Sequence, residues 1–94
     1  MTMITLPPVM DRTTTGALVK QLDQALVAGA AITVEGRDVN RIGQSGLQLL
    51  LSAQLTAQAR SAQLTVRPSQ AMIGAGHVAG LADTFNWGTR RNDQ

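Results

Sequence analysis

The sequence predicts a small α/β domain, built on a mixed sheet of about three to five strands with helices mainly on one face. Two observations lead to this prediction. Short segments in which apolar and polar residues alternate, as in strands, take turns with longer segments in which apolar residues recur at helical spacing. The chain has 94 residues, of which 44% are hydrophobic and 15% are charged, and this is the composition of one folded domain.

The first third of the chain predicts a strand, a helix and a second strand. Residues 3–6 are mostly apolar, and the two prolines that follow them would end a strand. Apolar residues recur with helical spacing over residues 13–28, and Gly29 follows where a glycine commonly ends a helix. Residues 32–35 alternate between apolar and polar side chains, which indicates a half-buried strand.

The middle of the chain predicts a turn and the strongest helix. Residues 36–38 have turn chemistry, and residues 39–42 are expected to form a loop or a short bridge. The helix is expected to begin within residues 43–46 and to end near Arg60. One apolar stripe is predicted to be its buried face. The stripe consists of Leu47, Leu51, Leu55 and Ala59, with Leu50 beside it.

The last third of the chain predicts another strand and a weaker helix. Residues 63–67 alternate between polar and apolar side chains and precede a proline, which indicates a strand. Ser69 is then placed to cap the N-terminus of a third helix. Beyond that helix, Leu81 and Phe85 are predicted to anchor the chain in the core.

The whole chain is expected to form a single domain over residues 1–94, with its core in about residues 3–85 and a polar tail at residues 86–94. Its start has no positively charged segment followed by an apolar stretch, so no signal peptide is expected. No apolar run approaches the roughly 20 residues of a membrane span, so we expect a cytoplasmic location without direct membrane insertion.

The composition argues against several classes of function. The chain has no cysteine and one histidine, His77, so we expect no disulfide, no metal site and no cofactor. His77 has no nucleophile or carboxylate at a recognisable spacing, so we interpret it as a partly exposed helix residue and expect no catalytic residues. The 8 Lys and Arg residues are scattered and aromatic residues make up 2% of the chain, which is unlike a nucleic-acid interface.

A loop of small and polar residues leads into the N-terminus of the strongest predicted helix. The first amides of a helix have no partner within it, and the helix dipole attracts anions to that end. Residues 43–46, Gly-Gln-Ser-Gly, lack the spacing and the Lys-Ser/Thr ending of a phosphate-binding loop. Three interpretations are open: an ordinary helix end capped by Ser45, a docking point or switch for a protein partner, and a site for a small anion, nucleotide or lipid.

Motifs in a fixed order along most of the chain resemble those of the STAS domain family, which includes anti-sigma factor antagonists and the cytoplasmic tails of sulfate transporters. The family has an apolar-Asp pair before its first helix and a strand that ends in an acidic residue. An Ile-Asp-Ser-Ser-Gly-Leu motif opens its second helix, and Pro-Ser, Gly-Leu and Phe follow. The matching residues here are Met10-Asp11, Thr33-Val34-Glu35, Val39, Ile42-Gly43-Gln44-Ser45-Gly46-Leu47, Pro68-Ser69, Gly80-Leu81 and Phe85.

The sequence departs from this family pattern at the phosphorylation motif. In antagonists that are switched by phosphorylation, the first serine after the Asp carries the phosphate. That position is Gln44 here, and Gly43 stands in place of the Asp. Gln44 has no hydroxyl, so the resemblance implies no phosphorylation there. Ser45 is the only candidate near the family's site, and it matches a serine that is generally not phosphorylated, so we expect little or none at Ser45.

The resemblance implies a STAS-like domain that acts without catalysis as a protein-interaction module. The first hypothesis is a bacterial signalling regulator that docks on an anti-sigma-type factor or on a kinase such as a chemotaxis histidine kinase. The alternative is a cytoplasmic accessory subunit of a lipid or anion transporter, because small degenerate STAS proteins resemble such subunits as well. The residues expected to contact the partner are Asp38, Asn40, Arg41, Gln44, Ser45 and Gln48. Arg41 is expected to point into solvent or toward Glu35 or Asp38, because a long cation is rarely buried without a partner.

Overall fold

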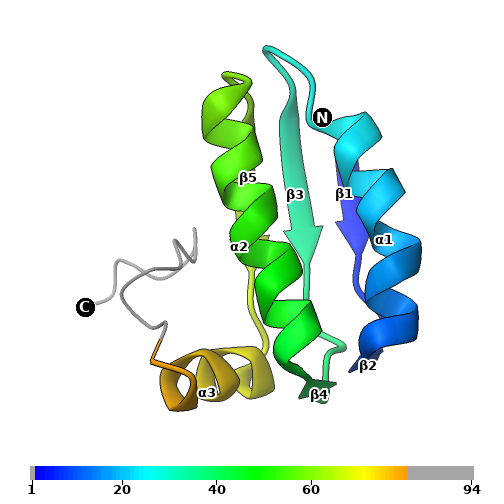
Figure 1. The fold of residues 1–94 in the computed structure, drawn as a ribbon, viewed down its shortest axis with the longest axis vertical. Coiled ribbons are helices and arrows are strands. Elements are labelled where there is room, and N and C mark those ends of the chain that lie inside the picture. The colour runs from blue at the N-terminus through cyan, green and yellow to red at the C-terminus, as the bar shows by residue number, and fades with distance from the viewer. Residues whose placement is uncertain (1, 81–94) are drawn as a thin grey trace.

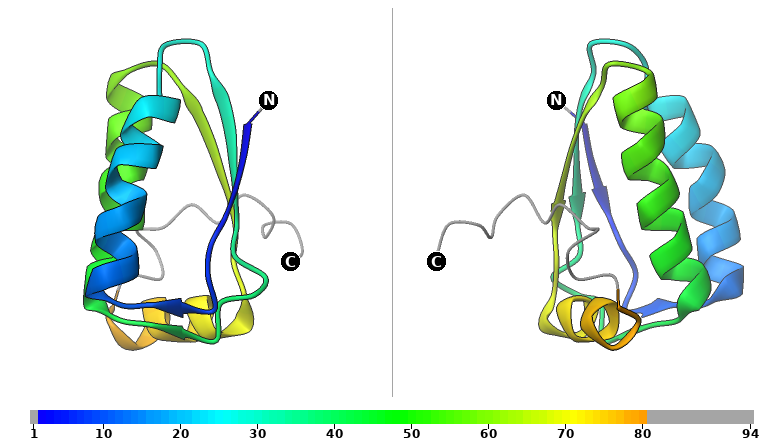
Figure 2. Two further views of the ribbon diagram at one scale, coloured as in Figure 1. Left: turned by 90° about the vertical axis from the view of Figure 1, so that its right-hand side faces the viewer. Right: turned by 60° about the vertical axis from the view of Figure 1, so that its left-hand side comes forward.

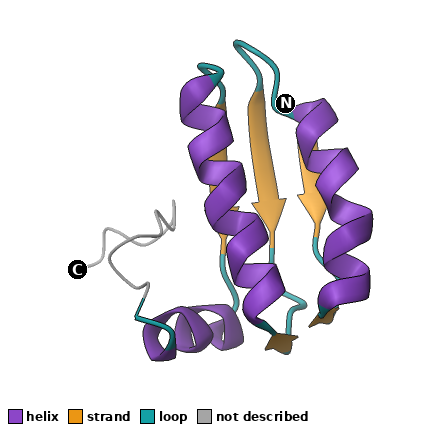
Figure 3. Ribbon diagram, in the orientation of Figure 1, coloured by secondary structure: helices purple, strands orange, loops and turns teal. Residues whose placement is uncertain are grey.

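A computed structural model describes residues 2–80 and confirms the α/β class that the sequence predicts. Figures 1 and 3 show long helices running beside a small sheet. The elements in chain order are β1 (Thr2–Thr5), β2 (Val9–Met10), α1 (Arg12–Ala25), β3 (Ala31–Glu35), β4 (Arg41–Ile42), α2 (Gln44–Ala59), β5 (Gln63–Arg67) and α3 (Gln70–Val78). The predicted anchors Leu81 and Phe85 and the predicted polar tail lie outside the described residues.

The main sheet has three strands in the order β1-β3-β5, so β3 is its central strand. In one row across the sheet, Ile4, Val34 and Val66 lie side by side, and all three are buried. β2 and β4 form a separate pair of two-residue strands. Every strand pair within residues 2–80 is parallel, so the mixed orientation predicted from the sequence has no antiparallel member in this part of the chain.

Helices α1 and α2 cover the same face of the main sheet, as predicted, and α3 lies across the end at which the strands finish (Figures 1 and 2). A chain that forms parallel neighbours must cross back along the sheet, and α1 and α2 make these crossings. The core fills the space between the two layers. Its largest fully buried side chains are Leu6, Met10, Leu22, Leu26, Leu50, Met72, Val34 and Val39.

The buried face of α2 differs from the predicted stripe. Its buried residues are Gly46, Leu47, Leu49, Leu50, Ala53 and Ala57. The prediction was correct at Leu47 and at Leu50 beside the stripe, and Leu51 is half-buried against the core, but Leu55 is 57% exposed and Ala59 is exposed. Leucines occupy several sides of the first half of this helix, so their spacing does not determine which side faces the core. Gly46, Ala53 and Ala57 lie on the inner face with three of the leucines, and Gly46 lets the helix start close to Ile42 and Met10 of the β2–β4 pair.

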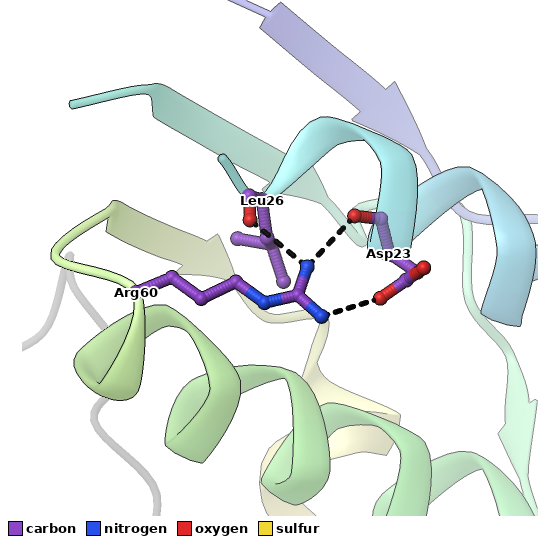
Figure 4. A network of polar contacts seen from close by, with 3 residues as sticks. All are labelled: Asp23, Leu26 and Arg60. Atoms are coloured by element: carbon purple, nitrogen blue, oxygen red, sulfur yellow. Dashed lines mark hydrogen bonds and ion pairs between the residues drawn. The ribbon is translucent and has the colours of Figure 1, made fainter. Parts of the chain in front are cut away.

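Helix α1 ends at Ala25, earlier than the predicted position 28. Leu26 follows as a buried C-cap residue, and Gly29 adopts a φ of +80° in the turn beyond it instead of ending the helix. Arg60, just after α2, donates hydrogen bonds to the carbonyl oxygens of Asp23 and Leu26 at 3.0 and 3.1 Å (Figure 4). These bonds satisfy carbonyls that a helix end leaves without partners, so the end of α2 stabilises the end of α1.

Side-chain caps fix the N-termini of α1 and α3. Ser69 caps α3 as predicted, because its Oγ accepts a hydrogen bond from the backbone N–H of Met72 at 3.1 Å. Asp11 caps α1, and its Oδ1 accepts from the backbone N–H of Thr14 at 3.0 Å. This hydrogen bond holds the pKa of the Asp11 carboxyl below its ordinary value of 3.8, because it stabilises the charged form.

Replacing Leu50 by alanine should destabilise the domain by about 2–5 kcal/mol, because the change leaves a cavity in the core. Leu50 is 1% exposed, whereas Leu55, a leucine of the same helix, is 57% exposed. Leu55→Ala should therefore shift the free energy of unfolding by less than about 0.5 kcal/mol. Urea denaturation of both variants measures the difference, and equal losses would contradict the orientation of α2 described above.

Acid should weaken the cap of α1. A carboxyl whose pKa is lowered on folding contributes stability above its ordinary pKa and loses that contribution as the pH falls through the lowered value. Below pH 3.8, the melting temperature of the wild-type protein should therefore fall faster than that of Asp11→Asn, which caps the helix without titrating. Thermal melts over a series of acidic buffers make the comparison. Parallel curves for the two proteins would show that the charge of Asp11 adds nothing to the cap.

Candidate functional site

The segment between β3 and α2 is held in place by backbone hydrogen bonds and one buried side chain. The N–H of Gly36 donates to the carbonyl oxygen of Arg67 at 2.8 Å, and the N–H of Asn40 donates to the carbonyl oxygen of Pro8 at 2.7 Å. Between these two bonds, Val39 is 2% exposed and belongs to the core. The loop therefore presents its remaining side chains from a fixed backbone.

The start of α2 packs tightly against the β2–β4 pair. The N–H of Gly43 donates to the carbonyl oxygen of Met10 at 2.9 Å. A Cβ atom on Gly46 would lie 2.7 Å from Cγ1 of Ile42 and 3.2 Å from Cβ of Met10, and the first of these distances is shorter than a normal carbon–carbon contact. Glycine at position 46 lets α2 begin this close to β4, so it positions the whole first turn of the helix.

The N-terminus of α2 has no side-chain cap. Gly43 is its N-cap residue, with φ of −88° and ψ of −178°, and no acidic residue lies in the first turn. Of the three interpretations left open for this helix end, the one in which Ser45 is the cap is wrong, because Ser45 lies within the first turn and α2 has no side-chain cap. The first backbone N–H groups of α2 therefore lack the side-chain acceptor that α1 and α3 have.

The structure brings some of the predicted contact residues together at this helix end. Asp38, Asn40, Arg41, Gln44 and Gln48 are exposed, and Ser45 is half-buried. Gln44 and Gln48 lie one turn apart on α2 and line the same cleft, together with Ile42. Asp38 and Asn40 lie on the preceding loop and are not among the residues that line the cleft.

The side chain of Arg41 pairs with neither of the carboxylates considered for it. Glu35 instead pairs with Arg67 at 3.4 Å and accepts a hydrogen bond from the backbone N–H of Arg37 at 3.2 Å. Asp38 has no ion-pair partner among residues 2–80. Of the directions predicted for Arg41, the structure supports the one into solvent.

The cleft beside Gln44 and Gln48 has a volume of about 620 Å³ and lies between α2 and α3. Its lining residues are Ile42, Gln44, Leu47, Gln48, Gly74, Ala75, Val78 and Ala79. The α3 side of this cleft was not predicted from the sequence. A signal was present, because small residues at positions 71, 74, 75 and 79 leave room beside a helix.

The described residues offer binding groups rather than a metal centre. His77 is exposed in the last turn of α3. Within residues 2–80, no three His, Cys, Asp or Glu side chains gather closely enough to hold a metal ion. In the same part of the chain, every helix is too short or too polar to cross a membrane. The site combines exposed amides, the guanidinium of Arg41, which has no ion-pair partner within residues 2–80, and an apolar cleft, and these groups can bind a partner through hydrogen bonds and apolar contacts.

The sequence matches a known domain family over most of its length. A family model described as "Mlab, STAS domain" matches residues 1–86. The chain belongs to the STAS domain family. This membership indicates a regulatory or protein-interaction module, because STAS domains are generally non-enzymatic and act through contacts with other proteins. No curated relative matches the chain.

A kinase assay tests whether this STAS domain has lost the phosphorylation site of the family pattern. Incubation with an anti-sigma-type kinase that phosphorylates STAS antagonists should leave the mass of the wild-type protein unchanged, because Gln44 has no hydroxyl and Ser45 is half-buried. Gln44→Ser restores a hydroxyl at the exposed family position and should gain the mass of one phosphoryl group. Intact-mass spectrometry with peptide mapping gives the answer. A phosphate mapped to Ser45 of the wild type would show that the switch has moved by one residue.

Proposed function

We propose that this STAS domain is a non-catalytic docking module that regulates a signalling protein, either an anti-sigma-type factor or a chemotaxis histidine kinase. One observation carries the proposal: the exposed N-terminus of α2 lacks a side-chain cap and follows a fixed segment in which Asp38 and Arg41 have no ion-pair partner among residues 2–80. The docking surface consists of Asp38, Asn40, Arg41, Gln44, Ser45 and Gln48.

The docking surface is preorganised for binding. Backbone hydrogen bonds to Pro8 and Arg67 hold its loop at both ends, and Val39 anchors the middle of the loop in the core. A surface whose backbone is fixed before binding loses little conformational entropy when a partner arrives. The first N–H groups of α2 can also donate hydrogen bonds to an oxygen of the partner without breaking a bond inside the domain.

A second candidate function is a cytoplasmic accessory subunit of a lipid or anion transporter. It is favoured by Gly43 and Gln44, which replace the Asp and Ser of the family's phosphorylation motif. A permanent subunit needs a lasting contact and no phosphorylation switch, so the missing hydroxyl fits this role. Affinity purification from the native host separates the two functions. Recovery of a kinase or an anti-sigma-type factor supports the regulator, and recovery of a permease with its ATPase supports the subunit.

Arg41→Glu should weaken binding of the recovered partner while leaving the fold intact. The reversed charge changes the association rate and the specificity of an interface, whereas an exposed substitution shifts the free energy of unfolding by less than about 0.5 kcal/mol. Lys20→Glu makes the same change of charge at an exposed position on α1, outside the docking surface, and serves as the control. A binding titration and a thermal melt of each variant provide the test.

Equal affinities of Arg41→Glu and the wild type would remove Arg41 from the interface. Loss of both affinity and melting temperature in Arg41→Glu would instead give this residue a structural role.

A further inference from the structure

The cleft between α2 and α3 has room for large apolar side chains. Its volume is about 620 Å³, and no charged residue is among the described residues that line it. Ile42 and Leu47 lie on its α2 side, and Ala75 and Val78 lie on its α3 side. Val78 is 89% exposed, and an exposed aliphatic side chain at an apolar hollow is typical of a surface that other residues cover. A charged occupant would lose water here without gaining a charged partner, so the walls favour an apolar occupant.

The described part of the chain ends at this cleft. Val78 and Ala79 line it, and Gly80 is the last described residue. Gly80 has a φ of +76°, in the left-handed region that favours glycine, and its N–H donates to the carbonyl oxygen of His77 at 3.0 Å. This geometry ends α3 and turns the chain out of the helix. The residues that follow are therefore tethered beside the cleft.

Residues 81–87 carry apolar side chains of a kind that the described core lacks. They include Leu81 and the only phenylalanine and tryptophan of the chain, Phe85 and Trp87. The chain has no tyrosine, so residues 2–80 contain no Phe, Tyr or Trp. Aromatic side chains bury about 150–250 Å² each when they pack, so these two can cover much of an apolar cleft.

The segment is long enough to cross the cleft. An extended chain spans up to about 3.5 Å per residue, so Phe85 can lie as far as about 17 Å from Gly80. The axes of packed helices lie about 8–10 Å apart, so this reach extends from α3 to α2. A tether this short also gives an effective concentration on the order of millimolar. The segment therefore fills the cleft ahead of a free partner of similar affinity.

We propose that residues 81–87 of this chain bind across the cleft and are its occupant. The rings of Phe85 and Trp87 pack against the apolar walls that Leu47 and Val78 provide. Both sides of this contact belong to one chain, so the inference goes beyond the proposed docking function and does not depend on it.

The proposed contact borders the docking surface. Gln44 and Gln48 line the cleft and belong to that surface. A partner that binds their amides therefore meets residues 81–87 as well, and the C-terminal segment helps to determine which partners fit.

The fluorescence of Trp87, the only tryptophan, reports on this contact. In the wild type, its emission maximum should lie at a shorter wavelength in native buffer than in concentrated urea, because a packed indole is shielded from water. A Cβ atom on Gly74, which lines the cleft, would meet nothing within 4 Å, and the same holds for Gly16 on α1. Gly74→Leu should fill the cleft and move the native emission maximum to a longer wavelength, and Gly16→Leu should leave it unchanged. Thermal melts establish that both variants are folded.

Two results of the fluorescence measurement would overturn the proposal. One is wild-type emission that is equal in buffer and in urea. The other is a short-wavelength emission that Gly74→Leu leaves unchanged, because Trp87 would then pack elsewhere, such as along the edge of β5 away from β3.

Photo-crosslinking gives a second measurement that does not require the cleft to be filled. A photoreactive residue at Gln48, which is exposed and lines the cleft, should crosslink to residues 81–87 of the same chain in the purified protein. The same photoreactive residue at Gln21, which is exposed on α1, should not. Peptide mapping identifies the crosslinked residues. Crosslinks that reach only α3, or only a second copy of this chain, contradict the inference.

Discussion

The parallel pairing of β3 with both of its neighbours determines where a functional surface can form in this domain. Each parallel neighbour requires the chain to return along the sheet, and α1 and α2 make these returns across the same face. As a result, the strands of the main sheet finish at one end of the molecule and both helices begin there (Figure 1). The β3–β4 loop, the β2–β4 pair and α3 gather at this end, and binding surfaces of open α/β sheets commonly form beyond the carboxyl ends of their strands.

Elements whose burial leaves a local pattern could be predicted from the sequence, and those that depend on contacts across the fold could not. The strand near residues 32–35 and the Ser69 cap follow from alternation and from capping chemistry, but the strand is not half-buried as predicted, because Thr33 and Glu35 are buried as well as Ile32 and Val34. The β2–β4 pair was missed as a pair, because strands of two residues have no period to recognise. The cleft depends on how α2 and α3 are placed, and no short segment of sequence encodes that placement. At the site, the exposure of Arg41 was predictable, whereas the α3 side of the cleft that Ile42 lines was not.

Arg60 shows how a polar contact at the surface can serve the packing of the two helices. Its ion pair with Asp23 measures 2.8 Å, but the two side chains are 43% and 62% exposed, and a pair of that kind contributes about 0–1 kcal/mol. The guanidinium also reaches the carbonyl oxygens of Asp23 and Leu26, as Figure 4 shows. Its main effect is therefore to close the C-terminus of α1, which keeps the two crossing helices together at the end of the domain away from the docking surface.

The three helices differ at their N-termini in a way that bears on the function. Asp11 caps α1 and Ser69 caps α3, whereas Gly43 leaves α2 uncapped. Glycine in place of a capping side chain costs a helix only a few tenths of a kcal/mol, so the fold tolerates this open end. Gly43 and Gln44 stand where the resembled pattern has an Asp and a phosphorylated Ser, so this chain carries neither a carboxylate nor a phosphate acceptor at those positions. Within residues 2–80, no side chain caps this end of α2, so the negative group that its dipole favours is supplied neither by Gly43 nor by Gln44.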